Sequence, residues 1–385
     1  MSMMYNEPWS KKHKSVTGGL PYNLSGSFSE PLTSKELINY ALERGDDELV
    51  DEYHNHSLAY TPNGGSLDLR EEAAKLYGPR ISADHILIFA GGQVALQTAA
   101  NGVVDKNSHS IVFAPGYQSV VQAPEHALSR ITRINLHADN NWQIDPKEVE
   151  RAVENNTRYI VFNEPYNPAG SLMKPDVQQA LVDIARKHDI IILCDEAYRF
   201  LEHNEADRLP AMADAYEHGI SACTMSKPWG GCGITIGWLA LQDLDLKQKI
   251  VDVQYFGTAC PGRASELQAI MTLRAHDIIV RKNLRIIQDN LRLLDQFMDK
   301  YRDLFEWVRP TAGTVGFVKF KGPLSSDKLG KELAKAGISI KPAYVFTEDV
   351  SEYRDYFRIG FGEKVMPMAL QALEEFVENN KDGWQ

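Results

Sequence analysis

An amine, a carboxylate, a phenol and an amide occur in this chain at points where predicted strands end. Lys227 follows a stretch of small and apolar residues and precedes a glycine-rich run. Asp195 and Tyr198 follow an apolar stretch typical of a buried strand, and Asn167 lies in a turn-forming segment after the strand before it. Ligands of open α/β sheets bind beyond the carboxyl ends of the strands, so we expect these groups to share one site.

This set of groups is what a pyridoxal phosphate (PLP) site requires. A lysine amine forms a Schiff base with the PLP aldehyde, and a carboxylate keeps the pyridine nitrogen protonated, so that the ring accepts electrons. The phenol and the amide can hold the 3-oxygen of the ring. Taken singly, Lys227 could be a solvated surface lysine and Asp195 a helix N-cap, but the combination favours the cofactor site.

Two further positions suit the same cofactor. Gly92 and Gln93 open a predicted helix directly after a strand, and backbone N–H groups at a helix N-terminus attract a phosphate. A glycine pair at such a turn is weak evidence by itself. Tyr117 follows another strand end, where it could stack on the pyridine ring or lie on the surface within its Pro-Gly turn.

Composition excludes several classes of function. The 385-residue chain has a formal net charge of −11 and a pI of about 5.5, which argues against nucleic acid or an anionic membrane as a partner. We find no secretory signal and no apolar run near the ~20 residues of a membrane helix, so we expect a cytoplasmic location. The four cysteines lack metal-ligand spacing, so we expect reduced core thiols and no metal site.

The order of elements predicts an α/β fold with a large, mostly parallel, seven-stranded-type sheet flanked by helices. Strands are expected over residues 86–89, 111–114, 159–162 and 190–194, with helices over 34–44, 67–77, 92–103 and 176–188. A long helix over 266–302 then leads to a smaller α+β domain with strands over 316–319, 338–340 and 356–359 and helices over 326–336 and 367–379.

Three regions are expected. Residues 1–45 form an N-terminal lid segment and a helix that packs on the small domain. Residues 46–285 form the large PLP-binding domain, and residues 286–385 form the rest of the small domain. Both ends of the chain therefore contribute to the small domain.

The chain resembles the fold-type I PLP-dependent enzymes of the aspartate aminotransferase superfamily, class I and II, over nearly all of its length. The motifs that carry the resemblance are Asp195-Glu-Ala-Tyr198, Ser226-Lys227, and Asn163-Glu-Pro-Tyr-Asn167-Pro-Ala-Gly170, which is similar to the family's Asn-Pro-x-Asn-Pro-Thr-Gly. The resemblance implies a homodimer with shared active sites, in which Tyr60 reaches the phosphate held by the partner subunit. It also implies that Arg358 grips the substrate α-carboxylate, which suits a bidentate guanidinium.

The chain also departs from that family. Typical aminotransferases carry an arginine on the cofactor phosphate eight residues after the Schiff-base lysine, and here that position is Thr235. Thr224, Thr235, backbone donors and the partner's Tyr60 are the candidates to replace this cation. Ala169 stands where the family motif usually has threonine. These departures indicate that the chain is not a standard transaminase of the commonest kind.

The N-terminal run over residues 16–33 is similar to that of PLP- and oxygen-dependent arginine oxidases and hydroxylases, in which this segment covers the active site. The hydroxylating members carry a histidine there, whereas residues 23–36 contain serines and no histidine, although His13 lies nearby. The resemblance therefore favours an oxidase. Glu7 and Thr17 are candidate substrate-binding residues, and Glu30 and Asp46 are further acids that could bind a guanidinium.

Three functions stay open. The first is O2-dependent oxidation of L-arginine to a 2-oxo acid through a quinonoid, with desaturation of the side chain as a further possibility and O2 as co-substrate. The second is a PLP-dependent aminotransferase that transfers an amino group between an amino acid and a 2-oxo acid. The third is a non-catalytic, PLP-binding regulatory protein. The expected partner is an amino acid as small-molecule substrate, and Lys227 and Asp195 are the central residues.

Overall fold

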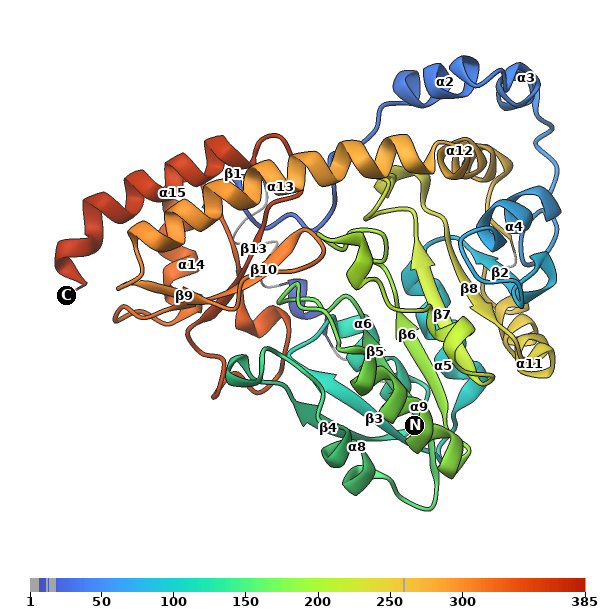
Figure 1. Ribbon diagram of the computed structural model, residues 1–385, viewed down its shortest axis with the longest axis horizontal. Coiled ribbons are helices and arrows are strands. Elements are labelled where there is room, and N and C mark those ends of the chain that lie inside the picture. The colour runs from blue at the N-terminus through green and yellow to red at the C-terminus, as the bar shows by residue number, and fades with distance from the viewer. Residues whose placement is uncertain (1–6, 12, 14–18, 259, 385) are drawn as a thin grey trace.

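The computed structural model describes residues 7–11, 13, 19–258 and 260–384. It contains a seven-stranded sheet covered by helices and a smaller four-stranded antiparallel sheet (Figure 1). The predicted α/β fold, with a large mostly parallel sheet and a smaller α+β part, is confirmed.

The large sheet has one antiparallel strand. Its order is β2-β8-β7-β6-β5-β3-β4, and β8 runs antiparallel to both of its neighbours, while the other pairs are parallel. Its strands are β2 (Ile86–Phe89), β3 (His109–Ala114), β4 (Arg130–Asn135), β5 (Thr157–Asn163), β6 (Ile191–Asp195), β7 (Gly219–Thr224) and β8 (Gly237–Leu241).

Helices cover both faces of this sheet. Ile160 and Val161 are successive residues of β5, and they belong to different apolar clusters, one with residues of α9 and the other with residues of α5. Because side chains alternate along a strand, both faces are buried and the strands read as continuous apolar runs. The helices of this part are α3 (Asp47–Asn55), α4 (Leu67–Ala74), α5 (Gly92–Val103), α6 (Gln118–Val121), α7 (Ala123–His126), α8 (Pro146–Ala152), α9 (Pro175–His188), α10 (Met212–Ala215) and α11 (Leu244–Tyr255).

The small sheet has the order β12-β13-β10-β9, and both ends of the chain contribute to this region. β1 (Tyr22–Asn23) pairs in parallel with β11 (Ile338–Ser339), which ties the N-terminal segment to the C-terminal part. The remaining elements are β9 (Phe305–Trp307), β10 (Val315–Phe320), β12 (Lys341–Pro342), β13 (Tyr356–Gly360), α14 (Ser326–Lys335) and α15 (Met366–Asn380).

The long helix predicted over residues 266–302 is wrong, because it is two helices. α12 (Arg263–Arg274) and α13 (His276–Lys300) meet at Ala275, whose φ of −94° and ψ of 13° lie outside the helical range. No glycine or proline marks this break in the sequence. α13 continues beside α15 along the upper edge of the view in Figure 1. The domain boundary that we propose near residue 285 falls inside α13.

The helix α2 (Ser34–Glu43) does not pack where we predicted. Leu37 and Ala41 belong to one apolar cluster with Met271 of α12, and Lys282 of α13 lies 2.9 Å from the Glu36 carboxylate. The prediction that this helix packs on the small domain is therefore wrong. β1, and not α2, is the N-terminal element that pairs with the C-terminal part.

Two properties of the described residues bear on the exclusions made above. None of the helices they form is both long and apolar enough to cross a lipid bilayer. Their His, Cys, Asp and Glu side chains form no group of three that could hold a metal ion. Cys194 and Cys223 are buried, but Cys260 is half-buried and Cys232 is exposed, so the prediction of core thiols is wrong for Cys232.

Candidate active site

A cavity of about 780 Å³ lies where the carboxyl ends of β5, β6 and β7 face the small sheet. Ten of the residues singled out from the sequence line it. They are Gly92, Gln93, Tyr117, Asn167, Asp195, Tyr198, Thr224, Lys227, Thr235 and Arg358. Parallel strands end at one edge of a sheet, which is why residues this far apart in sequence meet here.

Asp195 is the last residue of β6, the central strand between β5 and β7. The strand's apolar residues bury the carboxylate, which accepts a hydrogen bond from the Ala197 N–H at 3.2 Å. Burial raises the pKa of Asp195 to about 7, although the Ala197 N–H and the Lys227 amine act in the opposite direction. A buried carboxylate of this kind is stabilised by a cationic partner.

Lys227 follows β7 in the turn that leads towards β8, and its amine points into the cavity. The Nζ atom donates to Ser27 Oγ at 3.1 Å and lies 5.8 Å from the centre of the Tyr198 ring. Burial lowers the pKa of Lys227 to about 8, and the Arg358 cation acts in the same direction. A lysine with a lowered pKa is better suited to act as a nucleophile or a base.

The N-terminal segment over residues 23–31 lies across this site. Besides the contact of Ser27 with Lys227, the Ser27 carbonyl accepts the Tyr198 hydroxyl at 2.8 Å. The Ser25 carbonyl accepts Arg358 Nη2 at 3.0 Å. Burial raises the pKa of the Tyr198 phenol, which keeps it protonated as a donor.

Arg358, on β13, is joined to Asp195 by a chain of amides. Its Nη1 donates to Asn167 Oδ1 at 3.0 Å, the Asn167 N–H donates to Asn163 Oδ1 at 2.7 Å, and Asn163 Nδ2 donates to the Asp195 carbonyl at 2.6 Å. Arg358 is only 2% exposed, and its Nε–H has no hydrogen-bond partner among the described residues. The guanidinium also lies 5.0 Å from the centre of the Phe346 ring. This series of hydrogen bonds connects Arg358 to the backbone of Asp195, and both residues line the cavity.

The other end of the cavity is formed by the turn before α5. Gly91 has a φ of 103°, which favours glycine, and α5 begins at Gly92. A Cβ atom at Gly237 would lie 2.6 Å from the Gly92 nitrogen, so this turn packs closely against the start of β8. The first N–H groups of a helix lack partners within the helix and attract anions.

Hydroxyl groups surround the same turn. Thr224 Oγ1 lies 3.2 Å from Ser226 Oγ, and Thr235 Oγ1 donates to the Gly233 carbonyl at 3.4 Å. Thr235 has a φ of 56°, in the left-handed region. Gln93 Nε2 donates to Ser119 Oγ at 3.1 Å, next to Tyr117. This end of the cavity therefore offers hydroxyls and backbone N–H groups.

Two of the predicted site residues, Tyr60 and Glu7, do not line the cavity. Tyr60 is 98% exposed in this single chain. Glu7 is exposed and pairs with Lys11 at 2.8 Å. Thr17 lies outside the described residues.

The two further acids considered for a guanidinium also have other partners. Glu30 accepts the Lys364 N–H at 2.8 Å, and Asp46 pairs with Arg44 at 2.7 Å and Arg274 at 3.0 Å. Neither lines the cavity.

Sequence reasoning missed several lining residues. Ser226, Cys232, Lys341 and Phe346 line the cavity, as does Ser27, one of the serines of the N-terminal segment. Ser226 and Cys232 are close to Lys227 in sequence, so the motif could have suggested them. Lys341 comes from a short strand that no local signal connects to the site.

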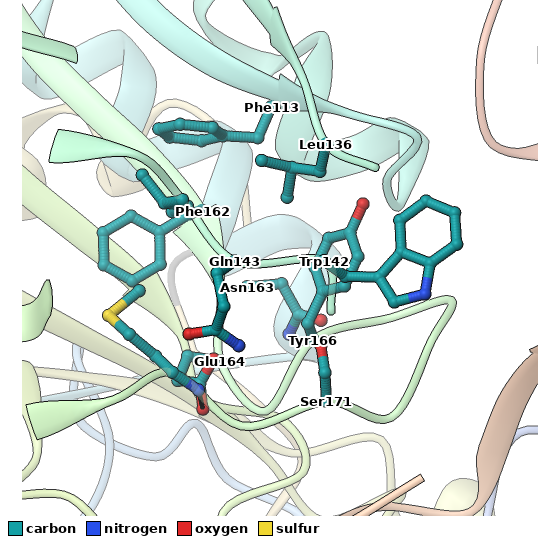
Figure 2. A pocket seen from close by; sticks show the side chains of 11 residues that line it. Phe113, Leu136, Trp142, Gln143, Phe162, Asn163, Glu164, Tyr166 and Ser171 are labelled. Carbon is teal, nitrogen blue, oxygen red and sulfur yellow. Dashed lines mark hydrogen bonds between the residues drawn. The ribbon is translucent and has the colours of Figure 1, made fainter. Parts of the chain in front are cut away.

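A second cavity lies on the other side of Asn163, which borders both. Figure 2 shows Phe113, Phe162 and Leu136 around it, within the apolar core. Its volume of about 10 Å³ is at the lower limit for a single water molecule. This space is a packing defect of the core and is too small for a substrate.

Comparison with known proteins agrees with this geometry. The model of the family aminotransferase class I and II matches residues 33–373. An aspartate aminotransferase of Pyrococcus horikoshii is 29% identical, but the match covers 57% of this chain and 55% of that protein. A probable aspartate aminotransferase of Methanocaldococcus jannaschii is 25% identical over 90% of each chain.

Other likenesses extend beyond the aspartate aminotransferases. The capreomycidine synthase of Streptomyces vinaceus is 24% identical, with 78% of this chain and 76% of that protein covered. In fold, the chain is similar to a PLP-dependent aminotransferase of Streptococcus suis, with a TM-score of 0.90, 23% identity, and 98% and 99% of the two chains covered. The chain belongs to the aminotransferase class I and II family.

Proposed function

We propose that this protein is an aminotransferase, which moves an amino group between an α-amino acid and a 2-oxo acid with PLP as its cofactor. The observation that carries the proposal is the convergence of Lys227, Asp195 and Arg358 on one cavity. The names of the two aspartate aminotransferase relatives support the same reaction.

The residues around the cavity fit PLP, the cofactor that family membership implies. Asp195 would pair with a protonated ring nitrogen, and this pairing would offset the cost of burying its carboxylate. The N-terminus of α5 at Gly92 and the hydroxyls of Thr224 and Ser226 would take the phosphate. Bound PLP supplies an aldehyde that links covalently to an amine and a ring that withdraws electrons from the substrate's α-carbon.

Lys227 would hold the cofactor and also take the proton from the α-carbon of the substrate at Nζ. With a pKa of about 8, roughly a tenth of such an amine is neutral at pH 7, far more than for an ordinary lysine. The Ser27 hydroxyl positions this amine through its hydrogen bond. Tyr198 and Asn167 would contact the ring oxygen.

Arg358 would bind the α-carboxylate of the substrate. It is buried, it faces the cavity, and its Nε–H has no hydrogen-bond partner among the described residues. A carboxylate can accept from Nε and a terminal nitrogen together, which would satisfy this donor. The substrate would displace or supplement the present contact with the Ser25 carbonyl.

Oxidation of L-arginine is the alternative outcome. It is supported by the N-terminal segment over residues 23–31, which covers the cavity and contacts Lys227, Tyr198 and Arg358. It has no support from the relatives described above, whose names do not include an oxidase. Asp195 is the one acid among the described residues that line the cavity, so these residues offer no further carboxylate to pair with a guanidinium.

We also propose that two copies of the chain share their active sites. Leu58, Tyr60 and Phe256 are 95%, 98% and 89% exposed, and the loops that carry them are joined by the hydrogen bond of Thr61 Oγ1 to the Pro261 carbonyl at 2.7 Å. Large exposed apolar side chains on two adjoining loops are typical of an interface. Tyr60 would then reach the phosphate bound in the partner subunit.

The test is whether turnover in air requires a 2-oxo acid as amino-group acceptor. PLP-loaded enzyme is given each amino acid with and without a 2-oxo acid, while product formation and oxygen uptake are followed. Turnover that requires the 2-oxo acid supports the aminotransferase. Oxygen uptake with arginine alone would support the oxidase instead, and PLP binding without any turnover would leave the regulatory protein.

A chemical test addresses Lys227 directly. Borohydride reduction of the PLP-loaded protein followed by peptide mapping should place the label on Lys227. Lys227→Ala protein should carry no label and show no turnover. Labelling of another lysine in the wild-type protein would overturn the assignment of Lys227.

A further inference from the structure

A pocket of about 330 Å³ lies apart from the active site, between the large and the small sheet. One side is formed by residues of the segment 137–142, which follows β4, and the other by residues of β9, β10 and β13. None of its described lining residues also lines the active-site cavity. The proposed function therefore gives this pocket no role.

Aromatic rings form much of the wall of this pocket. The ring centres of Trp142 and Tyr356 lie 5.5 Å apart, with an interplanar angle of 84°, and Tyr353 lies 6.4 Å from each of them. Trp307 and His137 also line the pocket. The face of an aromatic ring attracts a cation, and tryptophan and tyrosine do so most strongly.

Charged groups lie next to these rings. Glu306, Lys319 and Tyr356 are opposite one another on β9, β10 and β13, so their side chains form a row on one face of the small sheet. Lys319 Nζ lies 5.9 Å from the centre of the Tyr356 ring. Burial raises the pKa of the Tyr356 phenol, and the Glu306 and Asp139 carboxylates raise it further, so both carboxylates lie near this hydroxyl.

The charges of the described lining residues do not balance. Three carboxylates, those of Asp139, Glu306 and Glu352, stand against Lys319. Glu352 accepts a hydrogen bond from Asn135 Nδ2 at 3.2 Å. Glu306 and Asp139 form no ion pair within 4.0 Å with any described residue. Carboxylates beside aromatic faces favour a positively charged ligand.

The Trp142 indole adds a donor that needs a partner. Trp142 is 3% exposed, and its Nε1–H has no hydrogen-bond partner among the described residues. The residue lines both this pocket and the small cavity of Figure 2, which shows the indole nitrogen pointing away from that small cavity. A buried donor without a partner is unfavourable, so an acceptor on a ligand would stabilise it.

We propose that this pocket binds a small organic cation that also carries a hydrogen-bond acceptor. The cationic group would lie against the rings of Tyr356 and Trp142, near the carboxylates of Glu306 and Asp139. The acceptor would take the Trp142 N–H. Lys319 would oppose binding, because its ammonium group lies over the same ring. The inference goes beyond the proposed function and does not depend on it.

The test compares choline with 3,3-dimethylbutan-1-ol, which has the same shape and hydroxyl but carbon in place of the charged nitrogen. Calorimetry measures the binding of each to the PLP-loaded protein. The wild type should bind choline about tenfold more tightly than the alcohol. Glu306→Gln should lose most of this preference while it binds the alcohol as before. Lys319→Met should bind choline more tightly than the wild type.

Two further variants complete the test. Trp142→Phe keeps an aromatic ring but removes the N–H, so it should weaken choline and the alcohol by the same factor. Glu375→Gln, at an exposed position on α15, is the matched control for Glu306→Gln and should behave like the wild type.

Three results would overturn the inference. They are the absence of choline binding, equal affinities of the wild type for choline and the alcohol, and a choline preference that survives in Glu306→Gln. Failure of the proposed function gives a different result, since a protein without aminotransferase activity could still bind choline in this pocket. Weaker choline binding by Lys319→Met would likewise contradict the placement of the cation over Tyr356.

Discussion

Asp195 is a residue whose burial is unfavourable unless a cationic partner is bound. Its pKa in the folded protein, about 7, lies above the ordinary value of 3.8. A carboxyl with a raised folded-state pKa contributes stability below its unfolded pKa, and this contribution is lost as the pH rises to the folded pKa. The cofactor-free protein should therefore lose stability through Asp195 between about pH 4 and pH 7.

We predict that Asp195→Asn makes the cofactor-free protein more stable than the wild type at pH 8. Three pKa units correspond to on the order of 4 kcal/mol, which is the upper limit of the gain. The gain should shrink when the pH is lowered to 5, because the wild-type carboxyl is then largely protonated. Urea unfolding at several pH values measures it, with the exposed Asp139→Asn as the control. A difference that does not change with pH would contradict the prediction.

Thr235 occupies the position where the family usually has a phosphate-binding arginine, and it lines the cavity beside the N-terminus of α5. The described lining residues offer hydroxyls and N–H groups at this end of the cavity. Among them, Lys227 is the one Lys or Arg close to Thr235 in sequence. A charged donor makes a stronger hydrogen bond to a phosphate than a neutral one does.

We therefore predict that Thr235→Arg lowers the dissociation constant of PLP about tenfold, the value of one added charge-assisted hydrogen bond. Equilibrium dialysis of the cofactor measures the change. Thr235→Gln, which adds length without charge, should have little effect. An equal gain from glutamine would show that the charge is not the cause.

The residues that sequence alone identified are those in compact motifs at strand ends, such as Lys227 and Asp195. Ser27 could not be assigned in this way, because it meets Lys227 across 200 residues of sequence. Its place depends on the pairing of β1 with β11, which a two-residue strand does not reveal. Lys341 depends likewise on the register between β12 and β13.

At the scale of elements, the N-terminal segment is held against the cavity by close backbone contacts. A Cβ atom at Gly360 of β13 would collide with the Gly26 carbonyl, and one at Gly362 would collide with the Phe28 carbonyl. The Gly360 N–H donates to the Leu24 carbonyl at 2.7 Å. Glycine is required here because two backbones approach each other, and any side chain would separate them.

Gly360→Ala should therefore displace the segment over residues 23–31 from β13. Displacement of the segment would remove the contact of Ser25 with Arg358 and that of Ser27 with Lys227. We therefore expect at least a tenfold loss of kcat/KM, by analogy with other misplaced catalytic groups. Limited proteolysis should cut the N-terminal segment faster than in the wild type. Gly383→Ala, where an added Cβ meets nothing within 4 Å, is the control. Wild-type cleavage and activity would contradict this account.

Elements with strong local signals were predicted well, and those without them were not. β2 and α5 match their predicted ranges, because an apolar run and a glycine turn mark them. The sequence of β7 (Gly219–Thr224) indicates only a stretch of small and apolar residues, since Gly, Ser and Ala do not signal a strand. The placement of α2 on α12 depends on tertiary contacts of Leu37 and Ala41, which periodicity cannot direct to a particular partner.

At the scale of the whole molecule, one region of the surface does not suit an isolated chain. Leu58 and Tyr60 lie on one loop and Tyr255 and Phe256 at the end of α11, and all four are strongly exposed. Large apolar side chains gathered on the surface are normally covered by another molecule. A second copy of the chain is the partner that would also bring Tyr60 to an active site.

We predict that Phe256→Asp shifts the protein from dimer to monomer, because a charge cannot be buried in an apolar interface without a partner. Sedimentation velocity measures the assembly, and dialysis measures PLP retention, which should weaken as Tyr60 leaves the phosphate of the neighbouring subunit. Met368→Asp, which replaces an exposed residue on α15, is the matched control and should remain dimeric. A wild-type protein that is monomeric and fully active would show that each chain completes its own site, and Tyr60 would then have no part in binding the cofactor.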